Sequence, residues 1–495
     1  MAAGLDPRTP VLVGTAALTQ HTSDPMKALD AVALMVRALR SAAEDAGGRD
    51  PHQLLSKADL IMAPQPSWKC DDPARVVAGQ LGITPRSVRF DLGVLQQSMF
   101  TRAAADIASG AASIVLICGG EARSRAALAA KSGLHISAEP ESSGPPDELI
   151  APERDVVSQL EIQRKLYVAA RQYAIIETTL RGAAGQSIAE HAAEVAALWD
   201  GFADIARTRP EAWNQSATPL GDGVATPENP WYSWPYTKQH CSYWTVNQAA
   251  GLILCSVEAA EAVGIPRDRW VFPHAAATSN LMVMLSERAE PNRSPAIAEN
   301  GKAITELTGV APADADFLDI YSCFPAAVRV QAAELGIRAD RPWTVTGGMT
   351  FGGGPLNNYV LQSTARMADV LRENPGTTGI TTSISGFITK QGMGLWSTAP
   401  PAGGFRSSDT TDRARANTAV ATTDADYAGE AEVVGYTVAY EKTGPSVGIV
   451  IARALDTGEL IHTVATTEDA GLMASMTSEE WVGRRVTIDA GGVHV

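Results

Sequence analysis

Hydrophobic and polar positions over the first 120 residues follow two alternating periods. MKALDAVALMVRALRSAAEDAG (26–47) and QQSMFTRAAADIAS (96–109) repeat apolar residues every three to four positions, which is typical of amphipathic helices. Short, mostly apolar runs indicate strands: PVLVGTAALT (10–19), LIMAP (60–64), SVRFDLG (87–93) and SIVLICGG (113–120). Because strands and helices alternate along the chain, the pattern predicts a parallel-rich sheet with right-handed crossovers.

A similar rhythm returns after residue 267. Helical periodicity is found in SPAIAENGKAITELTG (294–309) and YVLQSTARMADVLREN (359–374). Strand-like runs precede, separate and follow these two segments: WVFPHAAATS (270–279), FLDIYSCF (317–324) and GITTSISGF (379–387). Two halves with the same order of elements predict an internal duplication.

The remaining segments differ from both halves. Residues 121–266 are helix-rich and contain the aromatic cluster NPWYSWPYTKQHCSYW. We therefore expect these residues to form an inserted domain that covers one end of the sheet. Beyond residue 417, β alternation and hairpin-like turns predict a small all-β, barrel-like domain. The expected division is 1–120 for the first half, 121–266 for the insertion, 267–400 for the second half, 401–417 for a linker and 418–495 for the β domain.

Composition excludes several classes of function. A formal net charge of −15 argues against a nucleic-acid binder, because phosphate contacts need a basic surface. No apolar run is long enough to cross a membrane, and the N-terminal MAAGLDPRTP lacks the features of a signal peptide. The five cysteines are scattered and form no CxxC pair, so we expect neither a metal site nor disulfides, and a cytoplasmic location.

Four segments together resemble the thiolase superfamily. SIVLICGGEARS is similar to the strand and GGxE motif that follow the nucleophile helix, and VNQAAGLILCSVEAAEAVGIP (246–266) to the DGAAALLL passage. YSCF (321–324) is similar to the NEAF or HDCF motif, and GGMTFGGGP (347–355) to GGxxxxGHP. The resemblance covers most of residues 8–400 and points to acetyl-CoA acetyltransferase-like proteins of the sterol-carrier-protein thiolase type. It implies a duplicated, five-layered αβαβα fold with an inserted helical loop domain, followed here by an OB-like domain.

The same resemblance implies that two catalytic groups are missing. Thiolases carry a nucleophilic cysteine at the start of a buried helix, where the helix dipole favours the thiolate. The family's spacing leads to the neighbourhood of Val94, and no cysteine lies between Cys70 and Cys118. In the GHP motif, Gly354 takes the position of the histidine that activates this cysteine. We therefore expect that covalent acyl-enzyme chemistry has been lost.

Other family positions keep polar groups. Tyr321 stands where the family has the asparagine or histidine of an oxyanion hole, and Cys323 stands where sterol-carrier-protein thiolases have an acid/base cysteine. A tyrosine hydroxyl can donate to an oxyanion or transfer a proton. These two are the candidate catalytic residues. Candidate substrate-binding residues follow from the remaining motifs and the glycine loop: Ser385, Gly386, Gly353, Gly354 and Asn357.

Two hypotheses of function follow. In the first, the chain is an acyl-CoA enzyme of lipid metabolism without a covalent intermediate, and its chemistry is of the aldol type, with Tyr321 as proton carrier. In the second, the chain is a non-catalytic acyl-CoA or lipid-binding protein or a partner subunit. A CoA ester is the possible substrate or ligand, and no cofactor is expected. Thiolases are usually homodimers, and the extra domain leaves a monomer and a hetero-assembly open as alternatives.

Overall fold

The computed structural model describes residues 5–142, 144–221, 223–455 and 457–495, so the first four residues of the N-terminal stretch lie outside the described residues. The first sheet is mixed, because β1 and β8 run antiparallel to their neighbours while β4, β2, β3 and β5 pair in parallel. Its strands, in spatial order, are β1 (Pro10–Thr19), β8 (Asn247–Ser256), β4 (Ile114–Ala122), β2 (Leu60–Pro64), β3 (Arg86–Phe90) and β5 (Glu148–Ile150).

The second sheet comes from the C-terminal half. Here β11 pairs in parallel with β10 and antiparallel with β12, which continues antiparallel to β9. The spatial order is β10 (Phe317–Asp319), β11 (Thr378–Ser385), β12 (Lys390–Ser397), β9 (Phe272–Ser279) and β13 (Arg406–Asp409).

Two buried helices form the layer between the sheets. Both α4 (Gln97–Ser109) and α13 (Tyr359–Glu373) contact strands of the first and the second sheet. The outer layers are α1 (Ala31–Asp45) with α3 (Pro73–Leu81) on one side and α10 (Pro295–Thr308) with α11 (Pro325–Leu335) on the other. The predicted αβαβα layering is therefore confirmed.

Glycines allow α1 to pack directly on the first sheet. A Cβ atom added to Gly14 of β1 would lie 2.1 Å from the carbonyl oxygen of Ala42, and one added to Gly251 of β8 would lie 2.6 Å from the backbone of Ala38. Both distances are shorter than van der Waals contact. The helix backbone thus rests on the strand backbone, and nine of its residues are buried.

The inserted segment contributes strands to two of the three sheets, the first sheet and that of the C-terminal domain. It supplies β5 to the edge of the first sheet and β8 to its interior, although residues 121–266 were expected to cover the end of the sheet. Its helices are α5 (Arg123–Lys131), α6 (Gln159–Gln163), α7 (Ala169–Ala184) and α8 (Ile188–Arg207). The strands β6 (Trp231–Trp234) and β7 (Tyr236–Thr237) from the aromatic cluster join the sheet of the C-terminal domain.

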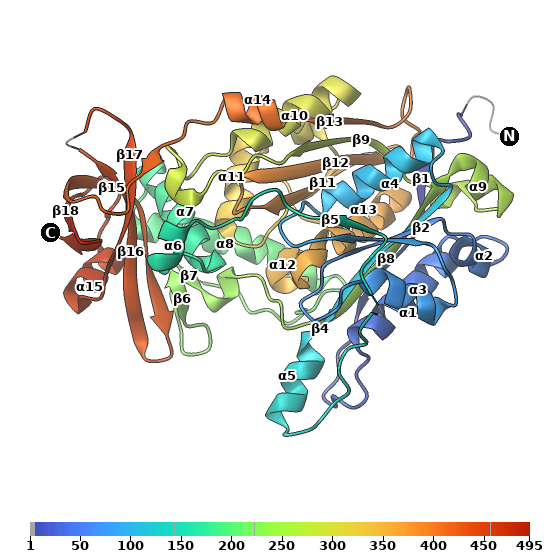
Figure 1. Cartoon of the computed structure of the whole chain (residues 1–495), viewed down its shortest axis with the longest axis horizontal. Coiled ribbons are helices and arrows are strands. Elements are labelled where there is room, and N and C mark those ends of the chain that lie inside the picture. Colours follow the sequence, from blue (N-terminus) through green and yellow to red (C-terminus); the bar gives the residue numbers. More distant parts are fainter. Residues whose placement is uncertain (1–4, 143, 222, 456) are drawn as a thin grey trace.

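The C-terminal domain is a closed ring of five strands. Along the chain, α15 (Ala470–Ser478) lies between the third and the fourth of these strands. Pairing runs β15–β16–β17–β19–β18 and back to β15, which fits the expected OB-like domain. The strands are β15 (Gly429–Glu441), β16 (Gly444–Ala454), β17 (Ile461–Thr467), β18 (Arg485–Asp489) and β19 (Gly492–His494). Figure 1 shows this domain at one end of the molecule, against α6 and α7.

The C-terminal ring packs tightly on α7. The Thr178 hydroxyl of α7 donates a hydrogen bond of 2.8 Å to the Tyr436 carbonyl oxygen, and Arg181 forms an ion pair of 2.8 Å with Glu480. A Cβ atom on Gly435 would lie 2.4 Å from the Thr179 hydroxyl oxygen, so glycine permits this approach. The ring is therefore anchored on the insertion.

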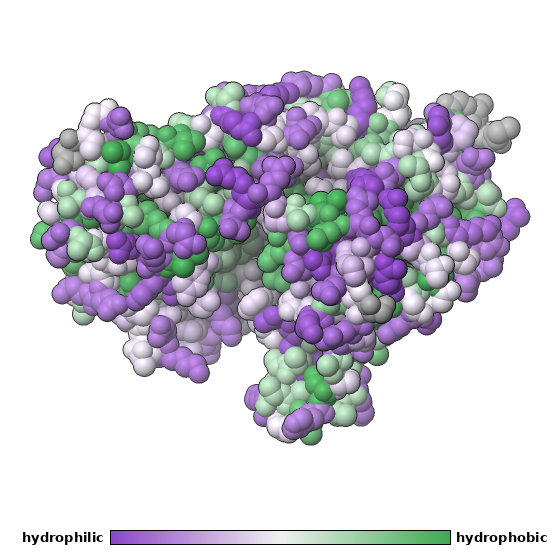
Figure 2. Space-filling view, in the orientation of Figure 1, coloured by the Kyte–Doolittle hydropathy of each residue, from purple (hydrophilic) through white to green (hydrophobic). Residues whose placement is uncertain are grey.

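Some expected elements differ in length. The strand expected over FLDIYSCF ends at Asp319, and the predicted linker 401–417 contains β13 and α14 (Thr411–Ala416). Within the described ranges, none of the helices combines the length and apolar character needed to cross a bilayer. On the face shown in Figure 2, polar and apolar residues are interspersed, and the protruding α5 carries mainly alanines.

Candidate functional site

Tyr321 lies in the short connection between β10 and α11 and is buried. Its hydroxyl is hydrogen-bonded to the side chain of Gln96, which precedes α4, and Gln96 accepts a bond of 2.8 Å from the Val360 N–H of α13. The Tyr321 ring meets Tyr359 edge-on, with centroids 5.7 Å apart. Burial, followed by the neighbouring Cys323 thiol, raises the pKa of Tyr321 above its ordinary value.

Cys323 lies two residues further and is also buried. Burial raises the pKa of this thiol to about 12, although a hydrogen bond with the Tyr173 side chain of α7 opposes the shift. Burial also raises the pKa of the nearby Cys241 thiol. Neither thiol is ionised at neutral pH, so neither is poised as a nucleophile or base.

Aromatic rings fill the space beside Cys323. The Phe324 ring stacks on Tyr173, with centroids 4.6 Å apart, and on Tyr236, with centroids 5.7 Å apart. On its other side Tyr173 meets Phe387, the residue after Gly386, at 6.1 Å. These rings come from the insertion, from the start of α11 and from the β11–β12 turn, so packing between three segments closes this side of the site.

Asp319, at the end of β10, positions the glycine loop. Its fully buried carboxylate accepts hydrogen bonds from the Val345 N–H (2.9 Å), from the Thr344 hydroxyl (2.8 Å) and from the Tyr359 hydroxyl (2.9 Å). The Tyr359 hydroxyl also lies 2.7 Å from that of Thr346. Burial, together with the Asp319 charge, raises the pKa of Tyr359 well above its ordinary value. The network holds the segment before the glycines in one conformation.

Gly353 and Gly354 meet the insertion at close range. Gly353 has φ +106°, and a Cβ atom there would lie 2.2 Å from Oε1 of Gln248. A Cβ atom on Gly354 would lie 3.3 Å from the Cβ of Ser242. The Gly354 N–H donates to the Tyr243 carbonyl oxygen at 2.8 Å. The glycine loop is thus packed against the backbone of the insertion.

The segment Cys241–Tyr243 lies between Cys323 and the glycine loop. The Ser242 N–H donates to the Cys323 carbonyl oxygen at 3.0 Å, and the Tyr243 N–H donates to the Met349 carbonyl oxygen at 3.0 Å. The Thr350 hydroxyl donates to the Cys241 carbonyl oxygen at 3.1 Å. These bonds, with that of Gly354, fix the segment on both sides, and it occupies the space between the two motifs.

The other predicted residues contact neighbours outside this region. The Ser385 hydroxyl donates to the Gly93 carbonyl oxygen at 3.1 Å, and the Gly386 carbonyl oxygen accepts from Arg288 at 3.1 Å. Asn357 lines a small cavity of about 10 Å³ together with Glu121. The structure therefore brings Cys323 and Gly354 to either side of Ser242, while Ser385, Gly386 and Asn357 contact different neighbours.

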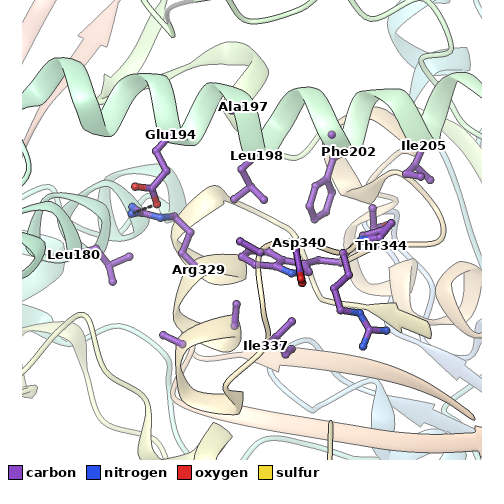
Figure 3. Close-up of a pocket in the computed structure, with 17 residues that line it drawn as sticks. Leu180, Glu194, Ala197, Leu198, Phe202, Ile205, Arg329, Ile337, Asp340 and Thr344 are labelled. Atoms are coloured by element: carbon purple, nitrogen blue, oxygen red, sulfur yellow. Dashed lines mark hydrogen bonds and ion pairs between the residues drawn. The ribbon is translucent and has the colours of Figure 1, made fainter. Parts of the chain in front are cut away.

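Two larger cavities are also present in the structure. A groove of about 850 Å³ lies between α8 and α11 and is lined by none of the predicted residues (Figure 3). A second cavity, of about 380 Å³, lies beside α5. Among the described residues, no group of three or more His, Cys, Asp or Glu side chains is arranged to hold a metal ion.

Sequence reasoning missed the residues that define this environment. Gln96, Tyr173 and Tyr359 each contact a predicted residue from a distant segment, and no local motif marks them. Asp319 carries a local signal, because an acidic residue at the end of an apolar strand needs buried donors.

Comparison with solved structures identifies the fold. A monomeric SCP2-thiolase-like protein type 1 from Mycobacterium smegmatis superposes with a TM-score of 0.81 at 24% identity, over 99% of this chain and 100% of that chain. The Ltp2-ChsH2(DUF35) aldolase gives 0.58 at 18% identity, over 79% of this chain and 98% of that one. Acetyl-CoA acetyltransferase from Syntrophomonas wolfei gives 0.54 at 16% identity, over 79% and 99%.

Sequence comparison adds no closer assignment, since no protein-family model and no curated protein matches the chain. The structural likeness extends over the C-terminal domain, because the mycobacterial protein is matched along almost the whole chain. The chain therefore has the thiolase fold and shares the fold of the mycobacterial protein over 99% of its length.

Proposed function

We propose that this chain binds a CoA thioester on a thiolase fold without turning it over. The observation that carries the proposal is the segment Cys241–Tyr243, whose backbone is hydrogen-bonded to Cys323 on one side and to the glycine loop on the other. A reacting thioester would need the space that this segment occupies.

The groups that remain also favour binding over catalysis. Claisen or thiolytic chemistry requires a nucleophile and a base whose pKa lies near neutral pH. Burial raises the pKa of both Tyr321 and Cys323, and the latter reaches about 12. At neutral pH both groups stay protonated, and the histidine position of the GHP motif is Gly354.

The ligand class is supported by chemistry near α5. A CoA ester carries phosphates, which need a cation, and an adenine ring, which stacks on aromatic surfaces. The Arg123 guanidinium lies 3.8 Å from the centre of the half-exposed Trp244 ring, and Arg123 lines the cavity of about 380 Å³. A human mitochondrial 3-ketoacyl-CoA thiolase of the same fold, at 15% identity, has been solved in complex with CoA.

Incubation with acetyl-CoA and decanoyl-CoA tests both parts of the proposal. We expect the ligand to raise the melting temperature, because binding stabilises the folded chain by a free energy of RT ln(1 + [L]/Kd). The intact mass should stay unchanged, and no new product should form. Arg123→Gln should weaken the effect about tenfold, whereas Lys131→Gln on the exposed end of the same helix should leave it unchanged. An acylated residue would contradict the non-catalytic part, and the absence of any shift would contradict the binding part.

Aldol-type chemistry is the second candidate. It is favoured by the presence of a buried tyrosine and a buried thiol, Tyr321 and Cys323, two residues apart in the same connection, and by the fold shared with the Ltp2-ChsH2(DUF35) aldolase. Retro-aldol cleavage of a β-hydroxyacyl-CoA that Tyr321→Phe slows by about a hundredfold would support this alternative against the first.

We also propose that the chain is a monomer. The edge strand β3 is covered by β5 of the same chain, and ion pairs of Glu148 with Arg102 (2.7 Å) and Arg86 (3.3 Å) hold β5 in place. The edge strand that results, β5, has only three residues, and so short an edge offers little backbone for pairing with a second copy. Light scattering after size exclusion should give the mass of one chain, and a stable dimer would overturn the proposal.

A further inference from the structure

The groove between α8 and α11 has the size and lining of a small-molecule site. Its volume of about 850 Å³ falls in the range of roughly 300–1,000 Å³ that ligand pockets occupy. Figure 3 shows Leu198, Phe202 and Ile205 of α8 along one side and Ile337 on the other. Trp343 also lines the groove. Most of the lining is therefore hydrocarbon or aromatic.

The groove is separate from the candidate thiolase site. The Phe202 ring lies against Gly348, where an added Cβ atom would be 2.6 Å from Cδ1 of the ring. This contact places the ring between the groove and the glycine loop. A ligand in the groove would not reach Tyr321 or Cys323, so its binding is independent of the function proposed above.

An arginine lies at one end of the groove. Nη2 of Arg329 donates to the Glu194 carboxylate at 2.9 Å (Figure 3), and Nη1 contacts Glu177 and lies 2.9 Å from Nε2 of His191. The Glu177 side chain is fully buried, whereas that of Glu194 is 51% exposed. Burial by itself would raise the pKa of Glu177, but Arg329, His191 and Tyr236 lower it to about 2.

The two carboxylates therefore differ in how easily they can be replaced. Glu177 also accepts a bond of 2.6 Å from the Tyr236 hydroxyl and is fixed by three elements. Glu194 is held by Gln186 and Arg329, and because its own side chain is 51% exposed it can move into solvent more easily than the fully buried Glu177. The other charged side chains at the groove have partners outside it: Asp340 pairs with Arg338 at 3.0 Å, and Arg341 donates to the carbonyl oxygens of residues 313, 315 and 316.

We propose that this groove binds a free carboxylic acid with a long hydrocarbon chain. The ligand carboxylate takes the place of Glu194 at Nη2 of Arg329, and the chain lies along Leu198, Phe202 and Ile337. Arginine is suited to this role because its planar N–H groups match a carboxylate. The ligand class differs from a CoA thioester, which has no free carboxylate at the acyl end.

Titration of the full chain with dodecanoate, followed by tryptophan fluorescence and calorimetry, tests the proposal. We expect saturable binding that changes the total tryptophan emission, to which Trp343 contributes, and a gain in affinity of roughly fourfold for each methylene from octanoate to dodecanoate. 1-Dodecanol should bind at least about tenfold more weakly. Decanoyl-CoA should not compete for this site. The absence of saturable dodecanoate binding, or equal affinity for the alcohol, would overturn the proposal.

Variants separate the anchor from the general charge of the groove. Glu194→Gln removes the competing carboxylate and should tighten dodecanoate binding by about threefold to tenfold. Asp340→Asn also removes one negative charge from the groove, but Asp340 has no contact with Arg329. This variant should change the affinity for dodecanoate by less than twofold. Ala197→Trp, at an exposed position that lines the groove, should abolish binding while leaving the circular dichroism and melting temperature unchanged. Equal effects of the two charge variants, or full binding by Ala197→Trp, would overturn the proposal.

Discussion

The backbone N–H of Ser242 donates a hydrogen bond of 3.0 Å to the carbonyl oxygen of Cys323, and this bond joins the insertion to the start of α11. The carbonyl oxygen of the next residue, Tyr243, accepts from the Gly354 N–H at 2.8 Å. Two motifs that are 31 positions apart in the sequence are thereby linked through a third segment. The closure of the candidate site depends on main-chain groups, which any residue except proline would provide at Ser242, Tyr243 and Gly354.

Ser242→Pro should open the segment. Proline has no N–H, so the bond to Cys323 cannot form, whereas Ser242→Ala retains it. We expect the proline variant to expose Cys323 to a thiol reagent and to increase its labelling rate at least about tenfold at pH 8, measured by mass spectrometry of the Cys323 peptide. The alanine variant should label like the native chain. Equal rates for both variants would show that this bond does not limit access.

Tyr359→Phe should destabilise the chain more than Tyr321→Phe. Tyr359 donates to the buried Asp319 carboxylate, and hydrogen bonds to charged groups are worth about 1.5–3 kcal/mol. Tyr321 bonds to the neutral Gln96, for which about 1 kcal/mol is expected. Urea unfolding followed by fluorescence measures both. The reverse order would contradict the anchoring role assigned to Asp319.

Gly353→Ala tests the contact with Gln248. The variant has a positive φ of +106° and places Cβ 2.2 Å from Oε1 of Gln248, whereas Gly376→Ala has a φ of +87° and open space. The control reports only the backbone cost of about 1–2 kcal/mol. We expect Gly353→Ala to lose a further 1–3 kcal/mol, roughly the cost of overpacking. Equal losses would mean that Gln248 moves away at no cost.

Glu139→Gln should stabilise the chain only at high pH. Burial raises the pKa of Glu139 from 4.5 to about 7, and the side chain is 15% exposed. The pKa of Glu139 is higher in the folded chain than in the unfolded chain, so folding favours the protonated carboxyl. The stability that this group contributes is fully present below pH 4.5 and is lost as the pH rises through 7. A glutamine stays neutral and still accepts from the Ala31 N–H.

The gain from Glu139→Gln should be on the order of 2 kcal/mol at pH 8 and close to zero at pH 4.5. Thermal unfolding across this range measures it. Glu141→Gln, on an exposed side chain paired with Lys69, is the matched control and should change the free energy of unfolding by less than about 0.5 kcal/mol. A pH-independent gain for Glu139→Gln would exclude a raised pKa as the cause.

The alternating strands and helices could be predicted because burial leaves a direct signal in the sequence, whereas the five-layered arrangement was expected from the resemblance to thiolases. The run around Cys118 is apolar at every position from Ile114 to Cys118, and β4 is buried along its whole length. The helix expected over 96–109 ends at Gly110, which adopts the left-handed conformation at the C-terminus of α4, as glycine commonly does. Periodicity alone also indicated the C-terminal β domain.

The candidate site could not be predicted to the same depth. Motif positions located Tyr321 and Cys323, but their environment depends on Gln96, Tyr173 and the backbone of Ser242, which come from three other segments. Backbone hydrogen bonds carry no residue signature, so a closing segment cannot be recognised in the sequence. The placement of β8 in the first sheet was missed for a related reason: the chain returns to that sheet after the whole insertion.

The pairing of β6 with β15 joins Trp234 to Val438, two residues separated by 204 positions in the sequence. A protease that cuts the connection before β14 (Thr422–Thr423) would therefore not release the C-terminal piece. The severed piece would stay bound through shared sheet hydrogen bonds and the contacts of Arg181 and Thr178. The C-terminal ring thus behaves as part of the insertion's own folding unit, and removing it would leave β6 and α7 without the surface on which they are built.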